Sequence, residues 1–267
     1  MTVHLFGGVW SPNCANFALH RTVSISPRGY TGPYVLRAQM LFQQLSRLNY
    51  GWDDVIPPDI AEQWGRRLKD IQLMRNLNIP RSVKPTDFNI KSNQLHNFAD
   101  ASETGYGAVT YLRMTDVNDK IHCSILMSKS RLAPLKGMTI PRLELTAAVE
   151  AIKMDELLRR ELEIPLLESV YWSDSMIVLL YIQNDESRFQ TYVANRIAKI
   201  RNHSSPYQWR HIPSKSNPAD DASRGITAKL TGNQRWIHGP SFLWKDENAW
   251  PVQPQFKCAQ IFSGTKC

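Results

Sequence analysis

The stretch LHNFADASETGYGAVTYLRMTDVNDKIHCSILM, residues 95–127, decides the fold because it contains three strand-like segments in close succession. Leu95 to Ala99 predicts a short strand, Gly105 to Met114 a second, and Ile121 to Met127 a third with partial alternation of apolar and polar residues. Asn118-Asp119 fits a hairpin turn between the second and third strands. We therefore expect the sheet to begin with three consecutive antiparallel strands.

The sequence that follows alternates helices with strands. A strong helix is expected from Arg142 to Leu162, because apolar residues recur there at helical spacing after Pro141. The other elements expected are strands at Val170–Trp172 and Tyr207–Ile212, helices at Ser175–Gln183 and Phe189–Asn202, and a short helix after Asn217-Pro218 that Gly225 ends. Together they predict the α/β class, with a mixed five-stranded sheet flanked by helices.

Two further helices are expected before the sheet. Apolar residues at helical spacing predict one from Tyr34 to Leu48 and another from Ile60 to Leu77, separated by a loop with two prolines. Residues 78–87 are predicted to link them to the sheet. Near the N-terminus, Phe6 to Pro12 is rich in turn-forming residues and Asn13 to Arg21 fits only a short helix. The segment from Trp236 to Pro251 is rich in Trp and Pro with little periodicity.

Composition limits the classes of protein that this chain can belong to. Its 267 residues are 42% hydrophobic, which is enough for a substantial core, and 32 Lys and Arg against 24 Asp and Glu give a net charge of +8. This excess is compatible with a polyanionic partner without requiring one. The four cysteines have no CxxC spacing, so neither a zinc site nor a disulfide framework is indicated.

No segment suggests export or membrane insertion. The longest purely apolar run, Met176 to Ile182, is far shorter than the roughly 20 residues that a membrane span needs. The N-terminus lacks a basic segment followed by an apolar one. We therefore expect an intracellular protein, cytoplasmic or nuclear, with no membrane partner.

Four acidic residues stand where a predicted strand ends or a predicted helix begins. They are Asp100 in FADAS, Glu144 in PRLEL, Asp174 in YWSDS and Asp220 in NPADDASRG. Taken singly, three of them have structural explanations as turn, N-cap or first-turn acids. Glu144 differs, because burying a carboxylate among apolar helix residues is unfavourable without a metal ion or a donor.

The acids as a group favour a metal site, because the predicted sheet would bring these ends together. Carboxylate oxygens are the ligands that Mg²⁺ prefers, and three or four of them can hold two ions for hydrolysis of a phosphodiester. The cofactor expected is Mg²⁺, with Mn²⁺ as a substitute. Such chemistry also needs no Ser-His-Asp or Cys-His arrangement.

The four acids, in this order and in these contexts, resemble the ribonuclease H module of BEL/Pao-type retrotransposon polyproteins. The PRLEL and NPADDASRG strings are the most specific part of the resemblance. Residues 29–90 resemble the helical connection before that module, and residues 229–267 resemble the spacer that precedes the integrase. Residues 1–28 resemble a remnant of the reverse transcriptase, which leaves 91–228 for the ribonuclease H-like domain.

The resemblance implies a function and roles for the acids. The function is metal-dependent hydrolysis of the RNA strand of an RNA/DNA hybrid, and the partners that the resemblance implies are this nucleic acid and the rest of a Pol polyprotein. Asp100 would bridge both ions, Glu144 and Asp174 would hold the ion at the leaving group, and Asp220 would help to hold the ion that activates water. The alternative is a catalytically inactive transposon remnant, or a host-adopted fragment that binds nucleic acid.

Other activities of such polyproteins are not expected here. The Tyr-x-Asp-Asp polymerase motif is absent, and so are the Asp-Thr-Gly and Asp-Ser-Gly motifs of aspartic proteases. The zinc-binding and catalytic parts of an integrase would lie beyond Cys267. We therefore expect neither polymerase, protease nor integrase activity.

A stretch without acids, from Ser187 to Pro218, is the candidate nucleic-acid-binding surface. Its basic residues are Arg188, Arg196, Lys199, Arg201, Arg210 and Lys215. Arg196, Lys199 and His203 recur on one side of the predicted helix. They form either an ordinary solvated face or a contact surface for phosphates. His211 is a candidate auxiliary residue that would approach the scissile phosphate, and the alternative is an ordinary strand residue.

Overall fold

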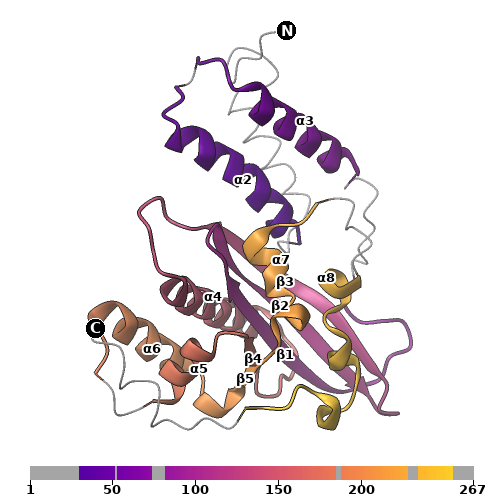
Figure 1. Ribbon diagram of the computed structural model, residues 1–267. Coiled ribbons are helices and arrows are strands. Elements are labelled where there is room, and N and C mark those ends of the chain that lie inside the picture. Colours follow the sequence, from indigo (N-terminus) through magenta and orange to yellow (C-terminus); the bar gives the residue numbers. More distant parts are fainter. Residues whose placement is uncertain (1–29, 52, 74–81, 185–187, 228–233, 255–267) are drawn as a thin grey trace.

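The computed structural model describes residues 30–51, 53–73, 82–184, 188–227 and 234–254 (Figure 1). Its centre is a five-stranded sheet in the order β3-β2-β1-β4-β5. The strands are β1 (Ile90–Ala101), β2 (Gly105–Asp116), β3 (Ile121–Leu132), β4 (Val170–Ser173) and β5 (Trp209–His211). β1, β2 and β3 are antiparallel, whereas β4 runs parallel to β1 and β5 parallel to β4. The predicted mixed sheet is confirmed.

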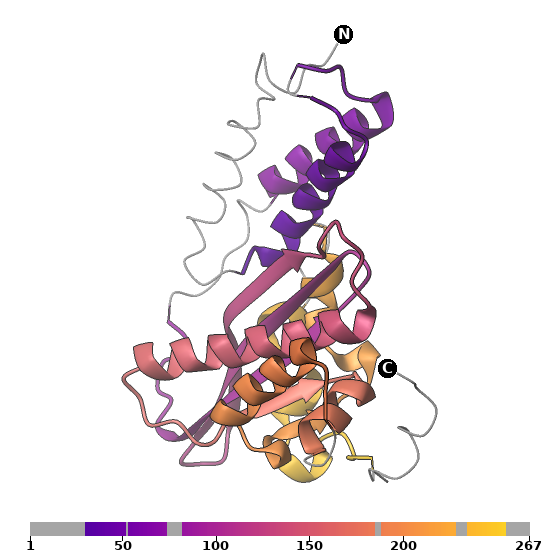
Figure 2. The ribbon, with the colours of Figure 1, turned by 90° about the vertical axis from the view of Figure 1, so that its left-hand side faces the viewer.

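One face of the sheet is covered by three helices, which lie together on that side in Figure 2. They are α4 (Ile140–Glu161), α5 (Met176–Gln183) and α6 (Thr191–His203). Their apolar side chains form one core with Ala99 and Tyr171 from the sheet. The alternate strand residues Phe98 and Trp172 belong to the core on the other face, as the period of two in a strand requires.

Several predicted boundaries differ from those observed. β3 continues to Leu132, past the predicted end at Met127, because its pairing with β2 extends through residues that lack apolar alternation. β5 begins only at Trp209, since Pro206–Gln208 forms a 3-10 helix. The predicted first segment, 1–28, lies outside the described residues.

The two N-terminal helices are α2 (Gly32–Arg47) and α3 (Pro58–Leu73), and they pack on each other through the rings of Phe42 and Trp64. The predicted extension of α3 to Leu77 and part of the predicted 78–87 linker fall outside the described residues. The start of α2 lies close to β3, because a Cβ on Gly32 would come within 3.1 Å of the Ser128 hydroxyl. The helical pair is therefore in contact with the sheet.

The C-terminal part of the chain covers the second face of the sheet. It comprises α8 (Gln234–His238) and the 3-10 helices Ser241–Trp244 and Glu247–Ala249. Trp236, Phe242 and Trp250 are buried in the same core as Phe98 and Trp172. Hydrophobic periodicity could not predict this packing, because the elements that carry it within residues 234–254 are at most five residues long. The proposed division of the chain at residue 228 stays a prediction.

β2 holds this C-terminal segment through Arg113. Its Nε donates to the Leu243 carbonyl at 2.9 Å and its Nη2 to the Lys245 carbonyl at 3.1 Å, while the guanidinium lies over the Trp250 ring. A further short helix on this face, α7 (Ala219–Arg224), packs against β1 and β2. Within the described ranges, no helix is long and apolar enough to cross a membrane.

Candidate metal centre

Three of the four predicted acids converge at one edge of the sheet. Ala99 of β1 pairs with Ser173 of β4 in parallel register, so Asp100 and Asp174 follow at the same edge. Glu144, in the first turns of α4, lies beside them. One carboxylate oxygen from each of the three is within 4.8 Å of the others, which is close enough for a shared metal ion.

Neutral donors hold two of these carboxylates. The Ser223 hydroxyl donates to Asp100 Oδ2, and Asn217 Nδ2 donates to Asp174 Oδ1 at 3.4 Å and to the Ala99 carbonyl at 3.1 Å. Glu144 differs, because its buried Oε2 has no hydrogen-bond partner among the described residues. A buried carboxylate oxygen without a donor is unfavourable, and a cation in the cluster would satisfy it.

The pKa shifts in the cluster also favour a bound cation. Burial, followed by the charges of Asp100 and Asp174, raises the pKa of Glu144 to about 9. Burial and the charge of Asp174 raise the pKa of Asp100 to about 7, although the Ser223 hydrogen bond opposes this. The group thus resists full ionisation in the absence of a counter-charge. An all-oxygen donor set of this kind fits Mg²⁺ or Mn²⁺.

Asp220 stands at the side of this group and is not one of the three converging carboxylates. It lies in the first turn of α7, is partly exposed, and forms an ion pair between its Oδ1 and Arg224 Nε at 2.5 Å. Its charge still reaches Asp100, whose pKa it raises. The adjacent Asp221 faces another way and pairs with Arg235 Nη2 at 2.9 Å.

Two glycines in β2 allow α7 to approach the sheet closely. A Cβ on Gly107 would lie 2.7 Å from Ala222 Cβ, and one on Gly105 would lie 2.9 Å from the Ser223 carbonyl. The Ser102 hydroxyl also donates to that carbonyl, at 2.9 Å. This close packing places the Ser223 hydroxyl against Asp100.

The donors that surround the acids were not predicted from the sequence. Asn217, Ser223 and Arg224 each contact a different predicted acid, and all three belong to the NPADDASRG string. From this string, only Asp220 was predicted to be a site residue, as one of the four acids. Ser223 and Arg224 lie in the same short helix as Asp220, and the spacing of four residues between Asp220 and Arg224 is a local signal for their ion pair. The partners of Asn217 and Ser223 are distant in sequence and could not be deduced from it.

Several of the predicted nucleic-acid-binding residues make contacts within the protein. Arg201 donates to the carbonyls of Ile182 and Asn184, and Lys199 Nζ lies 3.7 Å from Glu156. Arg210 pairs with Glu247 at 2.5 Å and lies over the Trp250 ring.

Arg196, Arg188 and Lys215 form no ion pair with an acid among the described residues. Arg196 stacks on the Tyr192 ring, 3.4 Å from its centroid, and donates to Thr146 Oγ1. Arg188 and Lys215 are exposed. The role of the whole set in binding nucleic acid stays a prediction.

The two histidines named from the sequence have distinct surroundings. His211 of β5 pairs with Ser173, the residue before Asp174, and its backbone N–H and carbonyl bond the side chain of Gln253. Its auxiliary role stays a prediction. His203, by contrast, lies 2.8 Å from the fully buried Asp155, which Asn97 and Arg159 also bond.

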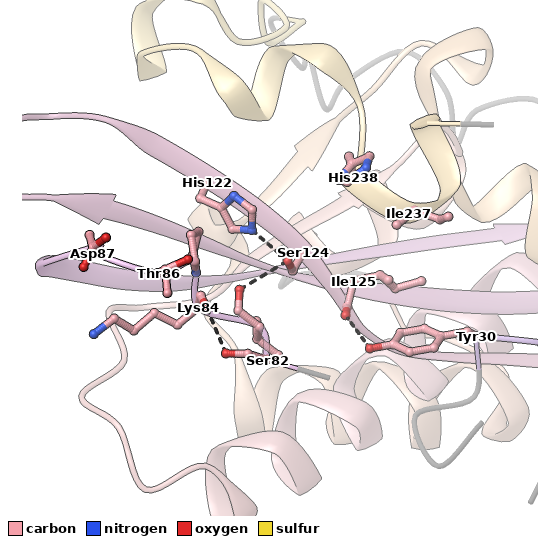
Figure 3. A pocket seen from close by; sticks show the side chains of 12 residues that line it. Tyr30, Ser82, Lys84, Thr86, Asp87, His122, Ser124, Ile125, Ile237 and His238 are labelled. Atoms are coloured by element: carbon pink, nitrogen blue, oxygen red, sulfur yellow. Dashed lines mark hydrogen bonds between the residues drawn. The ribbon is translucent and has the colours of Figure 1, made fainter. Parts of the chain in front are cut away.

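A cavity of about 640 Å³ lies elsewhere on the molecule, between residues 82–87, β3 and α8 (Figure 3). His122 and His238 line it, and the Tyr30 hydroxyl donates to the Ile125 carbonyl at its edge. None of the four acids is among its lining residues. The candidate chemistry therefore lies at the sheet edge and not in this cavity.

The strand order, the parallel pairing of β1 with β4 and the three carboxylates at the sheet edge define a ribonuclease H-like fold. Residues 23–175, more than half of the chain, match the family described as Pao retrotransposon-like RNaseH-like domain. The chain belongs to this family. The match includes Asp100, Glu144 and Asp174 and ends before Asp220.

Comparison with solved structures finds ribonucleases H of low sequence identity. RNase H1 from Halobacterium salinarum NRC-1 is 12% identical, over 52% of this chain and 98% of that one, with a TM-score of 0.33. LC11-RNase H1 in complex with an RNA/DNA hybrid is 16% identical, over 53% and 98%, with a TM-score of 0.34. The N-terminal RNase H domain of rv2228c from Mycobacterium tuberculosis is 9% identical, over 54% and 97%, with a TM-score of 0.33. No curated protein matches the chain.

Proposed function

We propose that this protein hydrolyses the RNA strand of RNA/DNA hybrids in a reaction that requires Mg²⁺ or Mn²⁺. The observation that carries the proposal is the convergence of Asp100, Glu144 and Asp174, whose oxygens lie within 4.8 Å of one another. A buried Glu144 oxygen without a donor supports a cation there. Membership of a ribonuclease H-like family of retrotransposons supports the substrate class.

The residues of the chain would divide the work as follows. Asp100, Glu144 and Asp174 hold the metal ions, and Asp220 completes the set from α7. When bound, such ions activate water and stabilise the charge that develops on the phosphate. Ser223 and Asn217 keep the Asp100 and Asp174 carboxylates oriented through the hydrogen bonds that they donate.

Contacts with the substrate backbone would come from basic side chains near this edge. The net charge of +8 favours a polyanion in general. Arg196 on α6 is the strongest single candidate, because no carboxylate among the described residues neutralises it and its stacking on Tyr192 fixes its position. Arg188 and Lys215 would add exposed charge.

The test is a comparison of substrates with the purified chain. An RNA/DNA hybrid, single-stranded RNA, and duplex RNA and DNA of the same sequence are each incubated with Mg²⁺, with Mn²⁺ and with EDTA. We expect cleavage of the RNA strand of the hybrid only, with 3′-hydroxyl and 5′-phosphate ends, and none in EDTA. A folded protein that binds the hybrid without cutting it would instead establish the alternative, a nucleic-acid-binding remnant.

A further inference from the structure

Arg224 stands out among the residues around the acids because of its charge. Within the described part of the chain, it is the one basic side chain in an ion pair with any of the four acids, through Nε and Asp220 Oδ1 at 2.5 Å. The other contacts to the acids, from Ser223 and Asn217, are neutral. The proposed nuclease function gives Arg224 no role.

The position of this guanidinium conflicts with metal binding at Asp220. A carboxylate oxygen that accepts a charged hydrogen bond is less available to a cation, and the positive charge repels any cation nearby. The charge of Arg224 also interacts with those of Asp100 and Asp174. We propose that Arg224 is the counter-ion of the metal-free site, and that a divalent ion at Asp220 binds in competition with its guanidinium. This inference rests on the metal site of the proposed function.

The structure allows Arg224 to leave without moving the helix. Its side chain is 64% exposed, and Asp220 is its one hydrogen-bonded or ion-paired partner in the described ranges. Exposed ion pairs of this spacing on a helix are weak, so a metal ion can replace one at little cost.

The backbone that follows Arg224, by contrast, is closely packed against α2. Gly225 has a φ of +74°, and a Cβ there would meet Arg37 and the Pro33 carbonyl of α2. Only the side chain of Arg224 therefore needs to rotate.

Competition predicts an effect opposite to that of a structural ion pair. Arg224→Gln removes the competing charge, so the metal-free protein should bind Mn²⁺ and Mg²⁺ more tightly. One unit charge several ångströms from an ion in a partly solvated site corresponds to roughly a 3-fold to 10-fold change in affinity. Arg224→Lys keeps the charge and should stay closer to the wild type.

The experiment is calorimetric titration of MgCl₂ and MnCl₂ into metal-free protein at low salt, without any nucleic acid. The matched control is Arg235→Gln, which breaks the ion pair of the neighbouring Asp221 and leaves the four acids alone. We expect tighter binding in Arg224→Gln and wild-type affinity in the control. Equal or weaker binding in a folded Arg224→Gln protein, checked by circular dichroism, would overturn the inference.

A second measurement follows the guanidinium itself. In the wild type, the exchange of the Arg224 Nε proton with water, followed by NMR, should accelerate when Mg²⁺ is added, because the bond to Asp220 is broken. Slow exchange in both states would contradict competition. These readouts need no cleavage, so a protein that binds metal competitively but cuts no hybrid would refute the proposed function alone. A wild type that binds neither metal would refute both.

Discussion

Glu144 is the residue whose surroundings most constrain the chemistry. Its folded-state pKa of about 9 lies above the usual value of 4.5, because of burial and the charges of Asp100 and Asp174. Folding therefore favours the protonated form. The stability that this group contributes to the metal-free protein is fully present below about pH 4.5 and is lost as the pH rises toward 9.

We expect the free energy of unfolding of the metal-free chain to fall between pH 6 and pH 9. Glu144→Gln should remove about 2–4 kcal/mol of this decline, because the amide does not titrate. Urea titrations in EDTA across this range measure the difference between the two proteins. Added Mg²⁺ should reduce the decline in the wild type, and identical pH profiles for the two proteins would contradict the account of the site.

Asp220 and Asp221 are adjacent in sequence but have different partners. Asp220 pairs with Arg224 and its charge raises the pKa of Asp100, whereas Asp221 is buried and pairs with Arg235. Asp220→Asn should therefore lower the hybrid cleavage rate by at least about 10-fold more than Asp221→Asn, which removes no group from the cluster. Steady-state cleavage rates at saturating Mg²⁺ compare the two variants. A larger loss of rate in Asp221→Asn would show that Asp221, and not Asp220, belongs to the metal site.

Among the helices and strands, α6 is the element that we expect to contact the phosphate backbone of the substrate. Its Arg196 has no acidic partner in the described ranges, whereas Lys199 lies 3.7 Å from Glu156. If Arg196 contacts a phosphate, Arg196→Ala should weaken hybrid binding irrespective of base sequence and reduce the slope of log K against log salt by nearly one.

Lys199→Ala is the matched control on the same helix and should change the slope less. Binding titrations over a range of KCl concentrations measure both slopes. If wild type and Arg196→Ala have equal affinities and equal slopes of log K against log salt, α6 is an ordinary solvated face.

Elements with a strong local pattern could be predicted from the sequence. α4 was expected from Arg142 to Leu162 and spans Ile140–Glu161, because its apolar face repeats over many turns. The four acids could be named because each occupies a strand or helix end. The hydrogen bond from Ser223 to Asp100 joins residues 123 positions apart, and no local pattern encodes such a contact.

In the molecule as a whole, residues 234–254 complete the core. Trp250 packs on Trp172 and Phe242, and the guanidinium groups of Arg113 and Arg210 lie 5.6 and 5.1 Å from the centroid of its ring. This arrangement depends on irregular backbone and short 3-10 helices, so hydrophobic periodicity could not reveal it. The segment resembles a spacer in sequence, yet its side chains cover one face of the sheet.

Trp250→Ala should destabilise the protein by about 3–5 kcal/mol, the usual cost of deleting a buried tryptophan side chain. Val252→Ala is the control in the same segment, because Val252 is 92% exposed and should change stability by no more than about 0.5 kcal/mol. Urea denaturation midpoints compare the two variants. Equal midpoints would mean that this segment does not belong to the folded core.

The proposed chemistry depends on the carboxylates at the sheet edge, and substitution of Asp100 tests it. The measurement is the single-turnover rate of hybrid cleavage in Mg²⁺ for wild type, Asp100→Asn and Glu103→Gln. Glu103 is an exposed acid three residues further along and is outside the cluster.

We expect Asp100→Asn to lose roughly 10³-fold or more in rate, the scale of removing a principal electrostatic stabiliser. Its stability should be equal or slightly higher, because like charges repel in the metal-free cluster. Glu103→Gln should cleave like the wild type. Unchanged cleavage by a folded Asp100→Asn protein would contradict the assignment of this site.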